Sequence, residues 1–533
     1  MSIEALVCTD KKTDPLTIRV NGREPTFTVA TDLIMAKAVA QLEERLLDLL
    51  DIAAVVFAAD GTFKRGDATR PQMGKDWRRT LDFTIPVRVP QFWSTPHVVH
   101  ALVDAVSFMT EDSVDFHFVQ REPTLPAQSF FSFDSRSATF EAEEVVLFSG
   151  GLDSYAGALE ALSTTSSKII LLTHRSSQKA IPHQVKLGKY LAEKFEGRVL
   201  HIHVPAHRVG EAASESTQRS RAFLFAALGQ VVAQAFAAKR LNFYENGIIS
   251  HNLPLSRQIV GSMASRTTHP LTLTKLNRLM DLVVPKTISI ENRYQWLTKA
   301  EVVGRIQTFN GADQLALTIS CTNNRDRNKL QTHCGNCSQC LDRRFAILAN
   351  GLEIHEPEEI YATDVLLGTR ETPRSRTMAL EWTRHAMALA GMEGRQFIGS
   401  FGTELARVAR GHEGLQSTEV LKRSHEMHRR HGQTIREVLL KAVQAIAPKL
   451  VDHLLPNSSL LRMFLVDARS TAQPCVGVAE LVHAPTETLE DFGDDWSVTD
   501  PEYCLRVRFL EKNGKPVVAV DLAPNSYPVL SSL

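Results

Sequence analysis

The chain has 533 residues, 43% of them hydrophobic and 23% charged, a composition that allows substantial cores and excludes a disordered or fibrous protein. At roughly 100 to 200 residues per domain, this length predicts about three domains. Sixty Lys and Arg residues balance sixty Asp and Glu residues, so the net charge of zero argues against a polyanionic partner such as tRNA or DNA.

The sequence shows no export signal and no membrane span. Its first residues lack the basic stretch and the apolar run of about 7 to 15 residues that a secretory signal needs. The longest apolar stretch, 223–238, contains Gln230 and Gln234 and is shorter than the roughly 18 residues of a membrane span. We therefore expect a buried helix there, and a cytoplasmic protein without membrane contacts.

Residues 1–120 are expected to form a small α+β domain, for which the sequence suggests no role. The runs 16–20 and 26–29 flank Asn21-Gly22 and predict a hairpin, and helical periodicity follows over 31–51. Residues 121–142, with scattered Pro and hydroxyl residues and no sustained period, are predicted to be a linker.

From residue 144 onward, short apolar runs alternate with helical ones. This alternation predicts an α/β domain over 143–352, with a parallel sheet covered by helices on both faces. A closing helix is expected to end at Gly351, a residue suited to the position after a helix. The expected strands are 145–148, 168–174, 198–204, 241–244 and 317–321, and the expected helices include 182–195, 220–239 and 339–350.

The rest of the chain is expected to be helical and then β-rich. Residues 353–377, which include GTRETPRSRT, are predicted to be a second linker. Long helical periodicity covers 378–408 and 417–447. The runs 503–510 and 517–522 flank Asn513-Gly514, a strong hairpin pattern, and complete a C-terminal region over 378–533.

A glycine turn between the first expected strand of this α/β domain and its first helix has the features of an anion site. Adjacent glycines let the backbone approach an anion, serine hydroxyls can donate to phosphate oxygens, and the helix N-terminus presents amides. Asp153 cannot hold a phosphate itself, so we expect it to cap the loop or to orient Mg²⁺. The alternative is an ordinary strand-to-helix turn. The residues predicted to bind nucleotide phosphates are Ser149, Gly150, Gly151, Leu152, Asp153 and Ser154.

This loop differs from the Walker A pattern. No Gly-Lys-Ser/Thr follows the glycines, so transfer of the γ-phosphate, as in kinases, is disfavoured.

Seven cysteines are too few for a disulfide scaffold, but four of them lie between residues 321 and 340. Four thiolates within reach of one another predict a tetrahedral Zn²⁺ site, whose negative charge Arg343 and Arg344 could offset. A redox CxxC pair would leave two cysteines unexplained. An iron–sulfur cluster stays open, because spacing does not distinguish it from zinc. The predicted metal ligands are Cys321, Cys334, Cys337 and Cys340.

Three motifs follow one another along the chain: SGGLDS at 149–154, TKAE at 298–301, and Cys321 followed by CGNCSQC at 334–340. Together, and in this order, they resemble the motifs of the 7-cyano-7-deazaguanine synthases of the queuosine pathway. These are N-type PP-loop ATP pyrophosphatases with a HUP-like fold, similar to the adenine nucleotide alpha hydrolases, and the resemblance covers residues 143–352. It implies a C–N bond-forming ligase that uses ATP and Mg²⁺ to adenylate 7-carboxy-7-deazaguanine. Ammonia then gives the amide, and a second ATP-dependent round gives the nitrile. Zinc in that family is structural.

Two basic residues are candidates to neutralise the phosphates of ATP, and both are expected to take part in catalysis beside Asp153. They are Arg221 and Lys299, each with a simpler alternative. Thr298 and Glu301 form a capping-box pattern around Lys299, and Arg221 could be a solvated helix residue.

Further candidates lie at the ends of expected strands, where sheets of this type bind nucleotides. Thr173, His174 and Arg175 are expected to border the adenosine. Glu245, Asn246 and Gly247 are candidates for the substrate side of the pocket. His201, His203 and His207 could suggest a second metal, but packing or surface histidines are the favoured interpretation.

Two departures from the family affect the expected substrate. Its Tyr-Pro-Asp-Cys-Arg-type segment is not found, since 251–270 reads HNLPLSRQIVGSMASRTTHP, and more than half of the chain lies outside 143–352. Enlarged relatives of this kind are associated with bacterial defence. We therefore hypothesise that a deazaguanine acid is activated and that the attacking amine belongs to a partner protein from a neighbouring gene.

Two alternatives stay open at this point. One is a tRNA- or nucleotide-modifying PP-loop enzyme, in which AMP activates a base carbonyl. The other is a degenerate PP-loop domain that serves as a nucleotide-binding or assembly module. The sequence does not indicate an oligomeric state.

Overall fold

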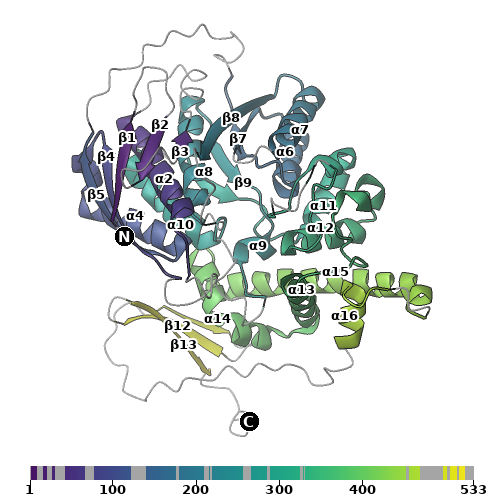
Figure 1. The fold of residues 1–533 in the computed structure, drawn as a ribbon. Coiled ribbons are helices and arrows are strands. Elements are labelled where there is room, and N and C mark those ends of the chain that lie inside the picture. Colours follow the sequence, from purple (N-terminus) through teal and green to yellow (C-terminus); the bar gives the residue numbers. More distant parts are fainter. Residues whose placement is uncertain are drawn as a thin grey trace.

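The structure is a computed structural model in which one long sheet with helices on its faces stands above a layer of C-terminal helices (Figure 1). It describes residues 2–8, 16–20, 27–29, 43–66, 77–121, 140–175, 179–208, 215, 219–255, 266–284, 288–323, 328, 330–451, 455–467, 496–500, 505–512 and 515–522.

Five strands form the parallel sheet that the sequence predicts, in the order β10-β9-β6-β7-β8. The strands are β6 (Glu144–Leu147), β7 (Ile169–Arg175), β8 (Val199–Arg208), β9 (Arg240–Phe243) and β10 (Ile290–Asn292). Four of them were predicted to within a few residues, so the α/β prediction is confirmed. The predicted strand at 317–321 is wrong. The 3-10 helix η1 (Ala312–Leu317) leads into a loop there, and the Ile319 amide donates to the carbonyl of Gly150 rather than to a neighbouring strand.

Helices cover both faces of this sheet. Along β6, Val145 packs into one core and Val146 into a second core on the opposite face, because successive side chains of a strand point to opposite faces of the sheet. The second core contains α6 (Leu152–Thr164), α7 (Ile181–Lys194), α11 (Lys299–Thr308) and α12 (Ser338–Ala349). The first contains α2 (Glu44–Thr62), α4 (Pro96–Thr110), α8 (Arg221–Ala235) and α10 (Pro270–Val283).

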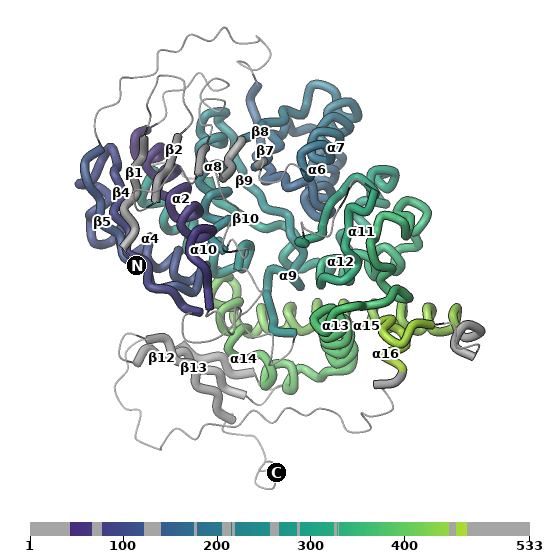
Figure 2. Tube along the Cα trace, viewed as in Figure 1, coloured from purple at the N-terminus to yellow at the C-terminus, as the bar shows by residue number. Residues whose placement is uncertain are grey.

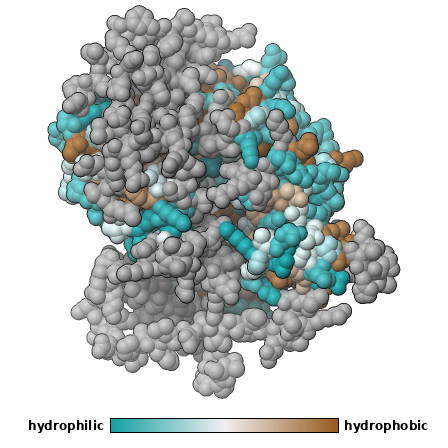
Figure 3. Space-filling view, in the orientation of Figure 1, coloured by the Kyte–Doolittle hydropathy of each residue, from teal (hydrophilic) through white to brown (hydrophobic). Residues whose placement is uncertain are grey.

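The apolar stretch near residue 230 is the buried helix that we expected. Residues 222–233 of α8 are all buried, including Gln230. Among the described residues, no helix combines the length and the apolar character that a membrane crossing requires. On the face drawn in Figure 3, hydrophilic and hydrophobic residues are interspersed over the coloured surface.

The N-terminal region contains helices and strands, as predicted, and its strands extend the same sheet. The hairpin is confirmed by β2 (Leu16–Val20) and β3 (Phe27–Val29), and β3 pairs antiparallel with β8. The order continues through β1 (Ser2–Cys8) and β4 (Thr80–Val87) to β5 (Ser113–Gln120). The sheet therefore has ten strands. Those before residue 121 form one half and those after residue 143 the other, and the pairing of β3 with β8 joins the two halves.

The predicted helix over 31–51 is confirmed only from residue 44, and it extends to Thr62 as α2. Residues 30–42 lie outside the described residues, as does most of the predicted linker 121–142. A short helix, α3 (Pro90–Trp93), precedes α4.

The C-terminal region is helical and then β-rich, as expected. Its first helix, α13 (Pro373–Gly391), begins inside the predicted second linker, because Pro373 suits the first turn and Thr372 Oγ1 accepts a hydrogen bond from the Ser375 amide at 3.1 Å. The sequence predicts one helical segment over 378–408, but the structure has two helices there. A break after Gly391 separates α13 from α14 (Gly394–Arg410). The tube in Figure 2 shows α13 against the 35-residue α15 (Ser417–Val451).

The last elements are α16 (Leu460–Asp467) and a three-stranded antiparallel sheet. The predicted hairpin is confirmed by β12 (Leu505–Lys512) and β13 (Lys515–Leu522), and β11 (Trp496–Asp500) adds a third strand.

The predicted capping box is present at the start of α11. Thr298 Oγ1 accepts from the Glu301 amide at 3.2 Å, and Glu301 Oε2 accepts from the Thr298 amide at 2.7 Å. We expect Thr298→Ala to lower the free energy of unfolding by about 1 kcal/mol, because an amide of the first turn loses its partner. Thr308→Ala, in the same helix, removes only a bond to the Gly304 carbonyl and should cost less than about 0.5 kcal/mol. Urea unfolding of both variants checks this, and equal losses would contradict it.

Candidate functional site

The predicted phosphate loop connects the end of β6 to the start of α6. Gly150 has φ +75°, and a Cβ there would lie 2.7 Å from Gln184 Cγ, so only glycine fits in both conformation and space. Ser149 Oγ lies 3.2 Å from Ser154 Oγ and accepts from the Gly151 amide at 3.2 Å. The first turn of α6 begins directly after Gly151, which leaves the N-terminal end of this helix at the loop.

Two neighbouring segments hold the loop backbone. Gln184 Nε2 donates to the Ser149 carbonyl at 2.9 Å, and the Ile319 amide donates to the Gly150 carbonyl at 3.0 Å. The loop carbonyls are thus bonded to protein donors. Carbonyl oxygens would repel an anion, so this arrangement favours presentation of amides and hydroxyls to a ligand.

Asp153 lies at the centre of a buried polar cluster made by three elements. Its Oδ1 lies 2.9 Å from Lys299 Nζ, and its Oδ2 accepts from the Asn246 amide at 3.2 Å and from Asn246 Nδ2 at 3.0 Å. Asp153 is 8% exposed and Lys299 3% exposed. The structure therefore brings together two predicted catalytic residues and one predicted substrate-side residue. Lys299 is also the first residue of the helix that Thr298 caps. The segment TKAE therefore forms a capping box and also places a lysine in the polar cluster.

Glu245, another predicted residue, follows β9 and interacts electrostatically with Asp153 and Lys299 of this cluster. Thr268 Oγ1 donates to its Oε2 at 2.6 Å. Asn292 fixes its backbone, accepting from the Glu245 amide at 3.0 Å and donating to its carbonyl at 2.8 Å. Burial raises the pKa of Glu245, and the negative charge of Asp153 raises it further. The hydrogen bond from Thr268 and the positive charges of Lys299 and Arg221 lower it, but the net shift is upward.

Asp342 is a carboxyl group near Lys299 that sequence reasoning missed. Burial raises its pKa to about 7, with Lys299 opposing the shift and Asp153 adding to it. Among the described residues, neither of its oxygens has a hydrogen-bond partner, and His431 Nδ1 lies 3.9 Å from Oδ1. In the sequence, Asp342 belongs only to an amphipathic helix after the cysteines, and no local pattern relates it to Lys299.

Arg221 begins α8 and is not a simply solvated helix residue. Its guanidinium lies 5.1 Å from the centre of the Phe225 ring, and within the described part of the chain its Nε has no hydrogen-bond partner. Burial lowers the pKa of Arg221, and Glu245 opposes the shift. A half-buried cation beside a carboxylate, at the N-terminal end of a helix, is suited to bind an anionic ligand.

The residues predicted to border adenosine are mostly engaged in packing. Thr173 Oγ1 donates to the Phe148 carbonyl at 2.9 Å and lies 2.8 Å from His201 Nε2. His174 is 1% exposed and packs edge-on against Phe57 and Phe225. The side chain of Arg175 lies outside the described residues.

The histidines of β8 fit the packing interpretation. The rings of His201 and His203 lie 3.8 Å apart, and His201 bonds to Thr173. Among the described residues, the four cysteines form the one group placed to hold a metal ion, and the side chain of His207 is not described.

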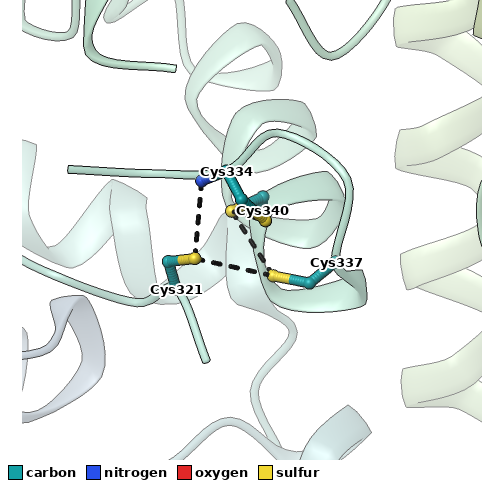
Figure 4. Close-up of side chains that lie close together, drawn as sticks. All are labelled: Cys321, Cys334, Cys337 and Cys340. Carbon is teal, nitrogen blue, oxygen red and sulfur yellow. Dashed lines mark hydrogen bonds between the residues drawn. The ribbon is translucent and has the colours of Figure 1, made fainter. Parts of the chain in front are cut away.

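The four predicted cysteines converge (Figure 4). Their Sγ atoms all lie within 4.8 Å of one another. Separations are 3.4 Å for Cys337–Cys340, 3.9 Å for Cys334–Cys340 and 4.0 Å for Cys321–Cys337. A tetrahedron with metal–sulfur bonds of about 2.3 Å has edges of about 3.8 Å. The cluster therefore fits a single ion such as zinc.

Backbone amides and the start of a helix support these sulfurs. The Cys334 amide donates to Cys321 Sγ, and the Asn336 amide donates to Cys334 Sγ, both at 3.4 Å. Cys337 is the N-cap of α12, whose positive end favours thiolates. Hydrogen bonds with neighbouring sulfurs, Cys334 first, raise the pKa of the Cys321 thiol, so ion binding at this residue would release a proton.

Both arginines that follow the cysteines are paired with glutamates, and Arg343 also interacts electrostatically with Cys340, so their expected role in offsetting the charge of the cluster stays a prediction. Arg343 Nε donates to Glu356 Oε2 at 2.7 Å, and Arg344 pairs with Glu358 at 3.1 Å.

Arg343 also connects the cysteine cluster to the phosphate loop. It donates to Thr318 Oγ1 at 2.7 Å and to Ser320 Oγ at 3.2 Å. Between these two residues lies Ile319, which donates to Gly150, and Cys321 follows directly. The segment 318–321 therefore runs from the loop to the first cysteine, held by an arginine of the helix that carries Cys340.

Comparison with known proteins adds no assignment. A scan against protein-family models finds no match for this chain, and a search of the curated proteins finds none either. A function for this chain must therefore be argued from the loop, the buried charges beside it and the cysteine cluster.

Proposed function

We propose that the chain is an ATP-dependent, AMP-forming C–N ligase of the 7-cyano-7-deazaguanine synthase type, with a PP-loop, HUP-like domain at residues 143–352. The observation that carries this proposal is Asp153 in the first turn after the loop, held by Lys299 and Asn246. A glycine loop at a helix N-terminus, at the carboxyl ends of parallel strands, is suited to bind a polyphosphate. A carboxylate fixed beside it is suited to a magnesium–nucleotide complex.

The chemistry requires activation of a carboxylate, which is a poor acylating agent. A substrate carboxylate oxygen attacks the α-phosphorus of ATP, pyrophosphate leaves, and the acyl-adenylate carries AMP as a leaving group. Amides of the first turn of α6 and the hydroxyls of Ser149 and Ser154 would bind the phosphates, and Arg221 and Lys299 would balance their charge. Mg²⁺, oriented by Asp153, would neutralise the leaving pyrophosphate.

The second half of the reaction needs a neutral amine. Glu245, a half-buried carboxyl group with a raised pKa, is suited to accept a proton from the amine as the new C–N bond forms. The amine then displaces AMP. The cysteine cluster, joined to the loop by 318–321, would hold a structural Zn²⁺.

For the substrates we propose a deazaguanine-type acid and, as the acceptor, an amine of a partner protein in a cytoplasmic bacterial defence system. The large regions outside 143–352 could supply a docking surface for such a partner. Co-expression with neighbouring gene products, followed by intact-mass measurement, tests this. A partner that gains the mass of a deazaguanine amide supports it, whereas efficient conversion of the free acid and ammonia to the nitrile supports the synthase activity instead.

ATP turnover should yield AMP and pyrophosphate, with no ADP. The loop lacks the lysine that assists γ-phosphate transfer, and it resembles the loops of ATP pyrophosphatases. Chromatography of nucleotides after incubation with Mg-ATP and candidate acids is the direct measurement. ADP and phosphate as products would contradict the proposed function.

A further inference from the structure

The first turn of α8, which carries Arg221, is held by charged residues of the N-terminal region. Asp60, near the end of α2, accepts hydrogen bonds at its Oδ2 from the Ser220 amide and from Ser220 Oγ, both at 2.9 Å. Ser220 is the N-cap of α8, and its own side chain caps no amide of the helix. A carboxylate from a distant segment thus satisfies the N-cap amide and places negative charge at the positive end of the helix.

Asp60 is itself fixed by a buried ion network. Its Oδ1 lies 2.7 Å from Arg79 Nη2 and 3.2 Å from Arg65 Nη2, and both arginines also pair with Asp112, at 2.6 and 2.7 Å. Asp60 is 1% exposed, and Asp112 and Arg65 are fully buried. Burial raises the pKa of Asp60, but Arg79 and Arg65 outweigh this and hold it below the usual value. Two arginines and two aspartates balance one another, so none can move without leaving a buried charge unpaired.

A second contact holds the residue before Ser220. Arg219, 1% exposed, pairs with Glu111 at the end of α4, and its guanidinium lies 5.0 Å from the centre of the Trp77 ring. Arg266 pairs with the same Glu111 at 2.6 Å. Both residues that precede Arg221 are therefore bound by the N-terminal region.

These contacts place Arg221 relative to the site. Phe225, one turn along α8, lies against both Arg221 and His174, which stands near the carboxyl end of β7. The phosphate loop follows the neighbouring strand β6, and Glu245 follows β9 on its other side. Among the described residues, Asp60 forms ion pairs with Arg65 and Arg79 and not with Arg221, so Asp60 can orient this cation without neutralising it.

We propose that Asp60 is a positioning residue of the active site: through Ser220 it fixes the first turn of α8, and thereby Arg221, for contact with the bound nucleotide. The inference rests on the proposed function. It gives the N-terminal region a role, since this region holds the first turn of the helix that carries Arg221.

The test compares two buried aspartates of the same helix. Asp60→Asn keeps the shape but puts an NH₂ group among the donors of Ser220 and Arg79. Asp48→Asn is the matched control, because Asp48 is fully buried and binds the Arg88 and Val89 amides and Trp93 Nε1, at 2.8, 3.0 and 3.1 Å, none of which lies in α8. Both variants should unfold at lower temperature. At a temperature where both are folded, only Asp60→Asn should lower kcat/KM for Mg-ATP, by about tenfold or more.

Two further variants separate positioning from a general loss of stability. Ser220→Ala removes one donor to Asp60 and should reduce kcat/KM by a smaller factor, about threefold. Arg221→Ala should reduce it strongly, and adding Asp60→Asn to Arg221→Ala should then change little, because the two residues act in series. Equal kinetic effects of Asp60→Asn and Asp48→Asn, or multiplying effects of Asp60→Asn and Arg221→Ala, would overturn the proposal.

The outcomes also distinguish this inference from the proposed function. If the wild-type protein forms no AMP, the proposed activity fails, and calorimetry of Mg-ATP binding then decides about Asp60. Weaker binding in Asp60→Asn than in Asp48→Asn supports positioning. Equal binding, or no binding by the wild-type protein, overturns it.

Discussion

Asp153→Asn is expected to reduce AMP formation by at least about a thousandfold, because the variant loses the carboxylate that orients the metal–nucleotide complex. The same change should lower the free energy of unfolding by about 3 to 5 kcal/mol, since Lys299 is left as a buried cation without its partner. Steady-state kinetics and urea unfolding measure the two effects separately.

A double variant separates these effects. Asp153→Asn with Lys299→Met removes both charges, so it should recover part of the lost stability but none of the activity. Asp313→Asn is the control for a general charge effect, because the Asp313 side chain is 83% exposed. Near-normal activity of Asp153→Asn would remove the basis for assigning the loop.

Cys337→Ser should eliminate metal binding and lower the unfolding temperature sharply. The wild-type protein is expected to be colourless and to contain about one zinc per chain, because four sulfurs at these separations are placed to bind a single ion. A hydroxyl is a much poorer ligand than a thiolate, and the binding free energy of a structural zinc is also folding free energy. Elemental analysis and thermal unfolding are the measurements.

The matched control for this change is Cys475→Ser, which replaces a cysteine outside the cluster and should leave the metal content unchanged. Two results would contradict the prediction. A brown protein that contains iron and absorbs visible light would indicate an iron–sulfur cluster. Full zinc content in Cys337→Ser would show that this cysteine is not a ligand.

The features that could be predicted from sequence are those with a local cause. Around Ser149–Ser154, the hydrophobic periodicity of the sequence predicts the strand and the helix, and the conformational freedom of glycine predicts the turn between them. The capping box at Thr298 depends only on hydrogen bonds within one helical turn. The cysteines converge because three of them follow one another at short spacing. The hairpin at Asn513-Gly514 likewise needs only its turn residues.

The parts that could not be predicted depend on contacts between distant segments. β10 has three residues, too few to show a period, and it is a strand because it pairs with β9. Asp342 and Lys299 are brought together by two packed helices, and Asp60 meets Ser220 across 160 residues of sequence. The joining of the N-terminal strands to the central sheet depends on the short pairing of β3 with β8. Single-sequence patterns contain none of these pairings.

The continuity of the ten-stranded sheet affects how the protein can be divided for experiments. In a fragment that starts near residue 140, the end of β8 would lose β3, and the apolar face of α8 would lose α2, which packs against it. Unpaired strand edges and exposed apolar helix faces favour association between chains. Such a fragment should therefore aggregate even though it contains the loop and all four cysteines, whereas soluble pieces would keep the N-terminal strands.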